Sequence, residues 1–205
     1  MKHIIKPALS LFIIAAIITA ALVFTYELTK EPIANQLRKT QEKTMKEVLP
    51  EADDYRELQT EISGNITGVF EGLKGTEIIG YVIELATPGY SGNIIMMVGI
   101  SKTENKIAGM RVLKHTETPG LGALAVKENF YRRYDGKALV PLKVVRVQPK
   151  EDEIEAITAS TITTKAITDA VNEAIIWYNE NVKPDLDCID DICEFESNFA
   201  EDEEP

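Results

Sequence analysis

Cysteine is scarce in this chain of 205 residues. Cys188 and Cys193 both lie close to the C-terminus, so the rest of the chain has no thiol and cannot be held together by disulfide bonds. The pair could close a small disulfide ring or remain as two free thiols. No histidine and no second cysteine pair lie nearby, which argues against a zinc site. We therefore expect no bound metal.

Basic residues are also few, with 22 Lys and Arg against 33 Asp and Glu. Ten of the acidic residues lie at 185–205, a segment without Lys or Arg, which leaves 22 basic and 23 acidic residues elsewhere. The chain lacks the clustered basic surface that binds phosphate backbones, so nucleic acid is excluded as a partner. The composition of residues 185–205 predicts an acidic disordered tail.

Charge is wholly missing from one long stretch, Ala8 to Phe24. A helix over residues 7–26 is long enough to cross a hydrocarbon core of roughly 30 Å. Lys2 and Lys6 precede it, so residues 1–6 are expected in the cytoplasm and everything after Tyr26 outside it. A cleaved signal peptide is the alternative. The sequence thus predicts a single-pass protein of the inner or plasma membrane, anchored in lipid.

The remainder divides into a stalk helix at 27–50 and an α+β domain at 51–184. The stalk is rich in Glu, Lys and Leu and ends at Pro50. Glu51 to Asn65 is expected to be a polar link. Short turn-rich separators predict an antiparallel sheet, followed by a helix, two strands and a final helix with an apolar stripe. The expected strands are 66–70, 77–85, 93–101, 107–114, 142–147 and 154–158, and the expected helices are 121–134 and a last one centred on 166–178.

The loop His115-Thr-Glu-Thr-Pro-Gly-Leu-Gly122 combines turn formers with polar groups. Pro119 and Gly120 favour a tight turn, and Gly122 would let a ligand approach the backbone closely. Glu117 and Thr118 could point polar groups into the gap. An ordinary Pro-Gly turn explains the same residues equally well.

The segment from Glu155 to Thr164 is rich in hydroxyl side chains and stands before the last helix. Thr163 or Thr164 can cap that helix, which leaves other hydroxyls without a local role: Thr158, Ser160 and Thr161. Because helix N-termini attract phosphates, a phosphate site is the functional interpretation, and a simple capped helix is the structural one.

Both segments, in this order behind one membrane helix, resemble the G subunit of the Rnf electron-transport complex and the related C subunit of the sodium-translocating NADH:quinone reductase. The family loop His-x-Glu-Thr-Pro-Gly-Leu-Gly is matched at every specified position from His115 to Gly122. The second family motif has an acidic residue, two positions, Ser or Thr, Gly, Ala, and a Thr or Ser. It aligns with Glu155, Thr158, Ala159, Ser160 and Thr161.

The resemblance implies an FMN-binding domain in which a flavin transferase, using FAD and magnesium, joins FMN to Thr161 through a phosphoester. The sequence departs from the motif at Ala159, where the family has Gly, and at Ser160, where it has Ala. These departures raise two questions, namely whether the loop keeps a glycine-type conformation and whether Ser160 competes as acceptor. The alignment with the family motif favours Thr161 over Ser160 as the acceptor.

The resemblance further implies that the loop lines a flavin pocket. The expected cofactor-binding residues are Thr161, Glu117, Thr118, Leu121, Gly122, Ser160, Thr163 and Thr164, with Glu155 and Thr158 as motif support. His115 is left out of the set, Lys165 is expected to be a solvated surface residue, and Tyr90 is expected to belong to a structural turn. No catalytic residue is assigned.

The resemblance implies a membrane-anchored electron carrier within a ferredoxin:NAD oxidoreductase complex that translocates ions. Its partners would be the other Rnf subunits, the flavin transferase and membrane lipid, and the chain would catalyse nothing alone. Two alternatives remain at this point: a membrane-tethered anion-binding or scaffold domain without flavin, and a stand-alone flavoprotein reductase.

Overall fold

The computed structural model describes residues 2–60 and 62–183. The chain divides into two compact units, residues 1–43 and 44–205, and each is described by itself. The predicted acidic tail, residues 185–205, and both cysteines lie outside the described residues.

The first unit is helical and belongs to α1, a helix that runs from Lys2 to Val48. This one helix covers the expected membrane segment at 7–26 and nearly all of the expected stalk. Its apolar side chains are exposed, with Leu11 and Phe12 both 70% accessible. By length and composition, α1 is able to cross a membrane, where lipid in place of water would cover these side chains.

A five-stranded antiparallel sheet organises the second unit, in the order β1-β2-β3-β4-β5. The predicted antiparallel sheet is confirmed, and four of its strands lie where β-rich runs predicted them. Sequence reasoning missed the short edge strand β1, because its polar residues Asp54–Glu57 read as a link. The strands are β1 Asp54–Glu57, β2 Ile66–Lys74, β3 Glu77–Pro88, β4 Asn93–Ser101 and β5 Lys106–Lys114.

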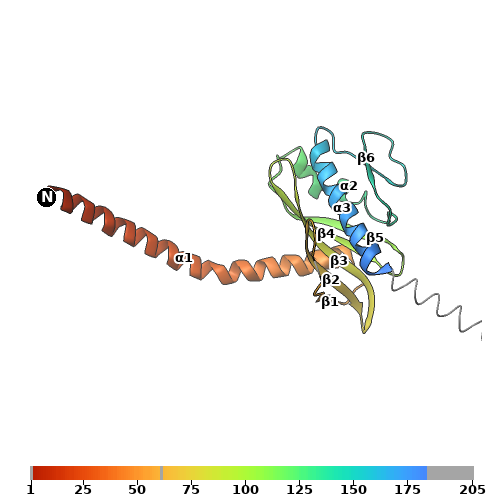
Figure 1. Ribbon diagram of the computed structural model, residues 1–205, viewed down its shortest axis with the longest axis horizontal. Coiled ribbons are helices and arrows are strands. Elements are labelled where there is room, and N and C mark those ends of the chain that lie inside the picture. Colours follow the sequence, from red (N-terminus) through yellow and green to blue (C-terminus); the bar gives the residue numbers. More distant parts are fainter. Residues whose placement is uncertain (1, 61, 184–205) are drawn as a thin grey trace, which may run out of the picture. The chain divides into compact units, whose positions relative to one another are not determined.

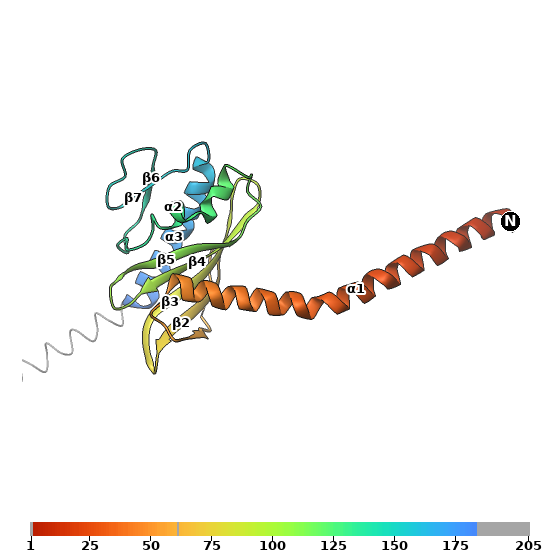
Figure 2. The ribbon, with the colours of Figure 1, turned by 180° about the vertical axis from the view of Figure 1, so that it is seen from behind.

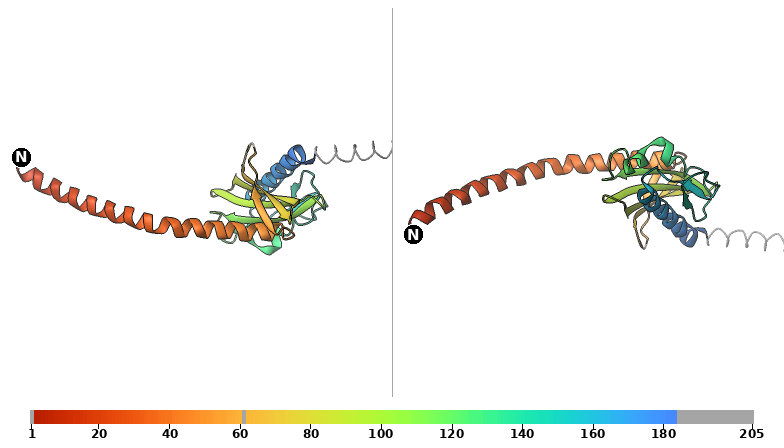
Figure 3. Two further views of the ribbon diagram at one scale, coloured as in Figure 1. Left: turned by 90° about the horizontal axis from the view of Figure 1, so that it is seen from below. Right: turned by 90° about the horizontal axis from the view of Figure 1, so that it is seen from above.

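Helix α3, Thr161–Asn181, packs on one face of this sheet (Figures 1 and 3). Its apolar stripe is buried as predicted, and Ile167, Val171 and Ala174 are completely inaccessible to solvent. They pack with side chains of β3 and β4 in the main hydrophobic core. The packing places the N-terminal end of α3 beside the loops that follow β3 and β5, which positions the site described below.

The opposite face of the sheet is covered by the chain segment that ends α1. Met45, Val48 and Leu49 are buried against Val82 and Met97. The approach is close because strand glycines face the segment. A Cβ on Gly99 would lie 2.2 Å from the Val48 carbonyl oxygen, so the sheet accepts this backbone only where the strand has no side chain. Strands β3 and β4 are therefore buried on both faces.

Between β5 and α3 the chain forms short elements at the end of the domain where α3 begins (Figure 2). They are the 3₁₀ helix η1 Gly122–Val126, α2 Glu128–Tyr131, and the parallel strands β6 Lys143–Val145 and β7 Glu153–Glu155. The single helix predicted over 121–134 is wrong, because Lys127 adopts an extended backbone with φ −81° and ψ 145° and separates η1 from α2. The strands expected at 142–147 and 154–158 are present but shorter.

Gly99→Ala is expected to destabilise the domain by about 1–3 kcal/mol, because the new methyl group forces the Val48 backbone away from the sheet. Thermal or denaturant unfolding of the full chain measures the change. Gly68→Ala is the matched control, since a Cβ there meets only the Phe70 ring at an ordinary 3.4 Å. Equal effects of the two substitutions would show that strand propensity, and not the close approach of Val48, requires Gly99.

Candidate functional site

A cavity of about 410 Å³ opens between the start of α3, the 115–122 loop and the turn that joins β3 to β4. Three segments far apart in the sequence contribute to it. Its lining contains seven of the eight predicted cofactor-binding residues, and only Thr164 is missing. The lining residues are Tyr90, Glu117, Thr118, Leu121, Gly122, Ala159, Ser160, Thr161, Ile162 and Thr163.

Glu117 connects the three segments. Its carboxylate is buried, with 6% of the residue exposed. Oε1 accepts hydrogen bonds from the backbone N–H groups of Tyr90 at 2.8 Å and Ser91 at 2.9 Å. Oε2 accepts a hydrogen bond of 2.7 Å from the Thr163 hydroxyl on α3. One side chain thus fixes the hairpin turn and the start of α3 relative to the loop.

These contacts also determine the charge of Glu117. Burial by itself raises the pKa of the carboxyl group. The hydrogen bonds from Ser91, Thr163 and Tyr90, together with the nearby His115, outweigh burial and hold the pKa below its ordinary value of 4.5. The side chain is therefore a carboxylate at neutral pH.

Gly122 is required by the packing of this carboxylate. A Cβ at residue 122 would lie 2.2 Å from Oε2 of Glu117 and 2.8 Å from the Thr163 hydroxyl oxygen. The missing side chain thus makes room for Glu117, and Gly122 also lines the cavity, so close approach of a ligand to its backbone stays a prediction.

His115 lies at the start of the loop and contacts the backbone of Glu117. Its Nδ1 accepts a hydrogen bond of 3.2 Å from the backbone N–H of Glu117. It is not among the residues that line the cavity.

The hydroxyl groups around the start of α3 have distinct roles. Ser160 is buried and donates to the Thr163 hydroxyl at 2.9 Å, and Thr163 donates onward to Glu117. The Thr164 hydroxyl accepts from the Ile157 N–H and donates to the Ser160 carbonyl oxygen, each at 3.0 Å. Neither threonine caps the helix as expected. Ser160 occupies the N-cap position, but its side chain makes no capping hydrogen bond.

Thr161 differs from these neighbours, because it is exposed and its hydroxyl bonds to no residue within 2–60 or 62–183. It begins α3 and lies in the cavity wall. Of the five hydroxyls in the segment 158–164, those of Thr158 and Thr161 are exposed and form no hydrogen bond with the described residues, and of these two only Thr161 lines the main cavity.

The two motif-support residues lie outside the main cavity. Thr158 is exposed on the preceding loop. The guanidinium of Arg133 contacts the backbone carbonyl of Glu155 and lies 4.0 Å from its carboxylate. Glu155 thus anchors the loop that leads to Thr161.

The backbone of Ala159 shows whether the loop keeps a glycine-type conformation without a glycine. Its φ is +60°, so the loop does adopt the left-handed conformation that glycine favours. An alanine in this region costs about 1–2 kcal/mol relative to right-handed backbone. The loop accepts this strain because hydrogen bonds of Ser160 and Thr164 hold the residues after it.

Exposed apolar side chains surround the polar centre of the cavity. Tyr90 is 70% exposed, Ile162 60% and Leu121 41%. Sequence reasoning predicted Leu121 but missed the other two. Tyr90 lay in a turn that a Gly-Tyr-Ser-Gly sequence already explained, and Ile162 gave no signal because aliphatic residues are common at helix starts. We call these three side chains, Tyr90, Leu121 and Ile162, the apolar frame of the cavity.

Glu117 is expected to make stability depend on pH. A carboxyl group with a lowered pKa stabilises the fold fully above its unfolded value near 4.5, and this contribution is lost as the pH falls through the folded pKa. Glu117→Gln should lower stability at neutral pH by about 1.5–3 kcal/mol and flatten the loss of stability below about pH 5. Unfolding of both chains across this pH range measures the effect.

Glu128→Gln is the control for that experiment, because Glu128 is an exposed carboxylate paired with Arg132 on α2. It should change stability by less than about 1 kcal/mol. A Glu117→Gln chain that keeps the wild-type acid dependence would contradict the role given to Glu117.

Ala159→Gly should stabilise the domain by about 0.5–1 kcal/mol, because relief of the left-handed strain exceeds the added entropy of the unfolded chain. Ala156→Gly, three residues earlier and without a positive φ, should destabilise it by a similar amount. Unfolding midpoints measure both. Changes of the same sign would rule out strain at residue 159.

Comparison with known protein families agrees with this geometry. Residues 89–176 match the family model of the FMN-binding domain, which includes the whole cavity lining. Residues 1–48 match the RnfG N-terminal region, which coincides with α1.

Individual relatives cover most of the chain. It is 35% identical over 193 residues to the G subunit of the Na⁺-translocating ferredoxin:NAD⁺ oxidoreductase complex of Acetobacterium woodii, covering 86% of this chain and 92% of that one. It is 31% identical to the G subunit of the ion-translocating oxidoreductase complex of Methanosarcina acetivorans, covering 87% and 96%. For the G subunit of the proton-translocating ferredoxin:NAD⁺ oxidoreductase complex of Clostridium ljungdahlii the identity is 32%, covering 79% and 83%.

Among solved structures, the chain is similar to the C subunit of the Na⁺-translocating NADH-quinone reductase of Parabacteroides distasonis. The TM-score is 0.49 at 20% identity, covering 62% of this chain and 76% of that one. The extent and identity of the sequence matches establish the relationship: the chain belongs to the family of G subunits of ion-translocating oxidoreductase complexes.

Proposed function

We propose that this chain is the flavoprotein subunit of an Rnf-type ferredoxin:NAD oxidoreductase complex and carries electrons through FMN bound covalently to Thr161. The observation that supports this most directly is the free, exposed Thr161 hydroxyl in the wall of the cavity. The neighbouring hydroxyls of Ser160, Thr163 and Thr164 are engaged in hydrogen bonds, and the exposed Thr158 does not line the cavity.

The size and the lining of the cavity support FMN as its ligand. A volume of about 410 Å³ falls in the range of small-molecule pockets. Tyr90, Leu121 and Ile162 offer apolar surface for a flavin ring, while Thr118 and the backbone of the 115–122 loop offer polar contacts. The first turn of α3 has no side-chain cap at Ser160, and uncapped helix N-termini favour phosphate groups.

Attachment is a phosphoryl transfer. The Thr161 oxygen forms a bond to the FMN phosphorus of FAD, the pyrophosphate P–O bond breaks, and AMP leaves. The hydroxyl proton passes to a base of the flavin transferase, and magnesium bound by that enzyme stabilises the phosphate charges. An exposed threonine can enter the active site of a second protein, whereas the buried Ser160 cannot do so without opening its bond to Thr163.

FMN supplies one-electron and two-electron redox chemistry when bound. The residues of the chain bind and orient it. Glu117 keeps the cavity walls in place through its contacts to Tyr90, Ser91 and Thr163. Because this side chain is already satisfied by three donors, its role is to shape the site.

Helix α1 anchors the subunit in the membrane, with the N-terminus in the cytoplasm and the flavin domain on the other side. One apolar helix without intramembrane charge offers no path for an ion. Ion transport therefore belongs to the other subunits of the complex, and relatives of this chain occur in both sodium-translocating and proton-translocating complexes.

Intact-protein and peptide mass spectrometry tests the proposal. The full chain, co-produced with a flavin transferase, should gain the mass of FMN less one water, on the peptide that contains Thr161. Thr161→Ala should abolish this mass, because the acceptor oxygen is gone.

Ser160→Ala and Thr158→Ala are the matched controls and should retain FMN, the first in reduced amount if loss of the bond to Thr163 loosens the loop. Loss of FMN in Ser160→Ala and its retention in Thr161→Ala would move the attachment to Ser160. A wild-type chain without FMN would favour the anion-binding domain.

A further inference from the structure

A second hollow, of about 320 Å³, adjoins the main cavity at the segment that contains Thr161. Thr161 and Ala159 belong to the linings of both. The remaining wall of the second hollow is formed by Arg146, Ala156, Ile157 and Thr158. Thr161 thus stands at the boundary of two spaces.

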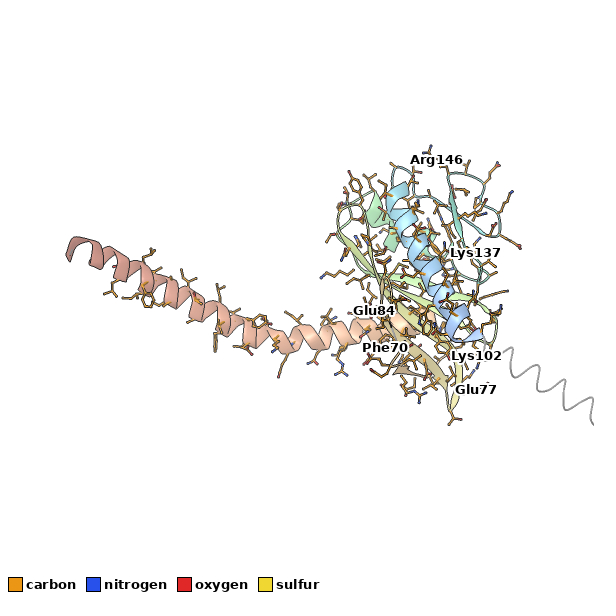
Figure 4. The ribbon with its side chains drawn as sticks, in the orientation of Figure 1. Phe70, Glu77, Glu84, Lys102, Lys137 and Arg146 are labelled. Atoms are coloured by element: carbon orange, nitrogen blue, oxygen red, sulfur yellow. The ribbon has the colours of Figure 1, made fainter. Side chains whose placement is uncertain are left out.

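The fold explains why Arg146 is there. Strands β6 and β7 pair in parallel, and their last paired residues are Val145 and Glu155. The next residues, Arg146 and Ala156, therefore leave the strands at the same end, and the Ala156 N–H still bonds the Val145 carbonyl oxygen at 2.8 Å. Asn172 of α3 holds this region through two hydrogen bonds to the backbone of Leu142, of 2.7 and 2.9 Å. Figure 4 shows Arg146 at the end of the domain where α3 begins.

The two spaces differ in charge. Among the described residues that line the main cavity, Glu117 is the sole charged one, and it is negative. Among those that line the second hollow, Arg146 is the sole charged one, and it is positive. Within residues 44–60 and 62–183, Arg146 forms no ion pair and no side-chain hydrogen bond, while the other arginines of this range, Arg56, Arg111, Arg132 and Arg133, all contact a carboxylate.

We propose that Arg146 is the counter-ion of the phosphodiester that joins FMN to Thr161, and that the second hollow holds this phosphate group. The inference rests on the proposed function, since it concerns the same attachment. A phosphodiester carries one negative charge, which Glu117 repels and Arg146 attracts. Guanidinium groups also match the geometry of phosphate oxygens, with two parallel donors.

The arrangement separates the two halves of the cofactor. The apolar frame of Tyr90, Leu121 and Ile162 takes the ring, and the phosphate turns away from Glu117 toward Arg146. Arg146 is a positioning residue, because it fixes the tether and does not touch the reacting part of the flavin.

A thermodynamic cycle tests this role without measuring electron transfer. The full chain is prepared in detergent with and without flavin transferase, and unfolding temperature is followed by the emission of Trp177, its single tryptophan, which is buried in the core. Attachment of FMN should raise the unfolding temperature of the wild type. In Arg146→Gln this rise should be smaller by about 2–4 °C, because the phosphate loses its partner.

Lys165→Gln is the matched control. Lys165 is an exposed cation on the first turns of α3 but lines neither space, so its loss should leave the rise unchanged. Arg146→Lys, which keeps the charge, should retain most of the rise, and Arg146→Glu should reduce it further.

The wild type alone supplies a second measurement. If an ion pair contributes to the rise, the rise should shrink when NaCl increases from about 0.05 to about 0.5 M. A rise that is independent of salt and equal in wild type and Arg146→Gln would overturn the assignment. Intact mass separates the two hypotheses, because a wild type without FMN contradicts the proposed function, whereas a flavinylated wild type without coupling contradicts only the role of Arg146.

Discussion

The buried carboxylate of Glu117 is the interaction on which the site depends. A buried charge is stable only when donors satisfy it, and here the donors come from the β3–β4 turn and from α3, two segments that are not adjacent in sequence. The carboxylate in turn places requirements on the residues around it. Gly122 must lack a side chain to admit the carboxylate, and the Thr163 hydroxyl must face it. The position of the cavity follows, because its walls are the three segments that Glu117 joins.

Once Glu117 engages Thr163, the other hydroxyls before α3 acquire their roles in turn. Thr163 accepts from Ser160, and Thr164 closes the loop against Ile157. Each of these hydroxyls is withdrawn from solvent and from competing chemistry. Thr161 is the first residue of α3 and stays exposed, although Thr164 and Thr168, on the same side of the helix and further along it, are buried. Packing thus withdraws three of the five hydroxyls from solvent and leaves Thr161 as the exposed one in the wall of the main cavity.

The packing of the sheet also stabilises the site, because it holds the strands from which the site loops leave. Helix α3 covers one face and residues 45–52 cover the other, so strands β3 and β4 are buried on both sides and form a rigid base for the loops at their ends. The residues that end α1 are therefore part of the core of the domain. The membrane-anchoring helix leads directly into this segment, so a change in the close contact between Val48 and Gly99 bears on the stability of the flavin domain itself.

The sequence by itself determined the membrane helix, the antiparallel sheet, the apolar face of α3 and the two motifs, because each is written in local periodicity or in contiguous residues. Periodicity failed at 121–134, where an extended Lys127 divides the helix, and at β1, whose polar edge residues carry no alternation. Only the tertiary structure decided that Tyr90 and Ile162 join the cavity, that Ala159 accepts a positive φ, and that Arg146 and Thr161 line the same second hollow. These features depend on contacts between segments well separated along the chain, such as the parallel pairing of β6 with β7 and the bonds of Glu117, and no local pattern encodes such a contact.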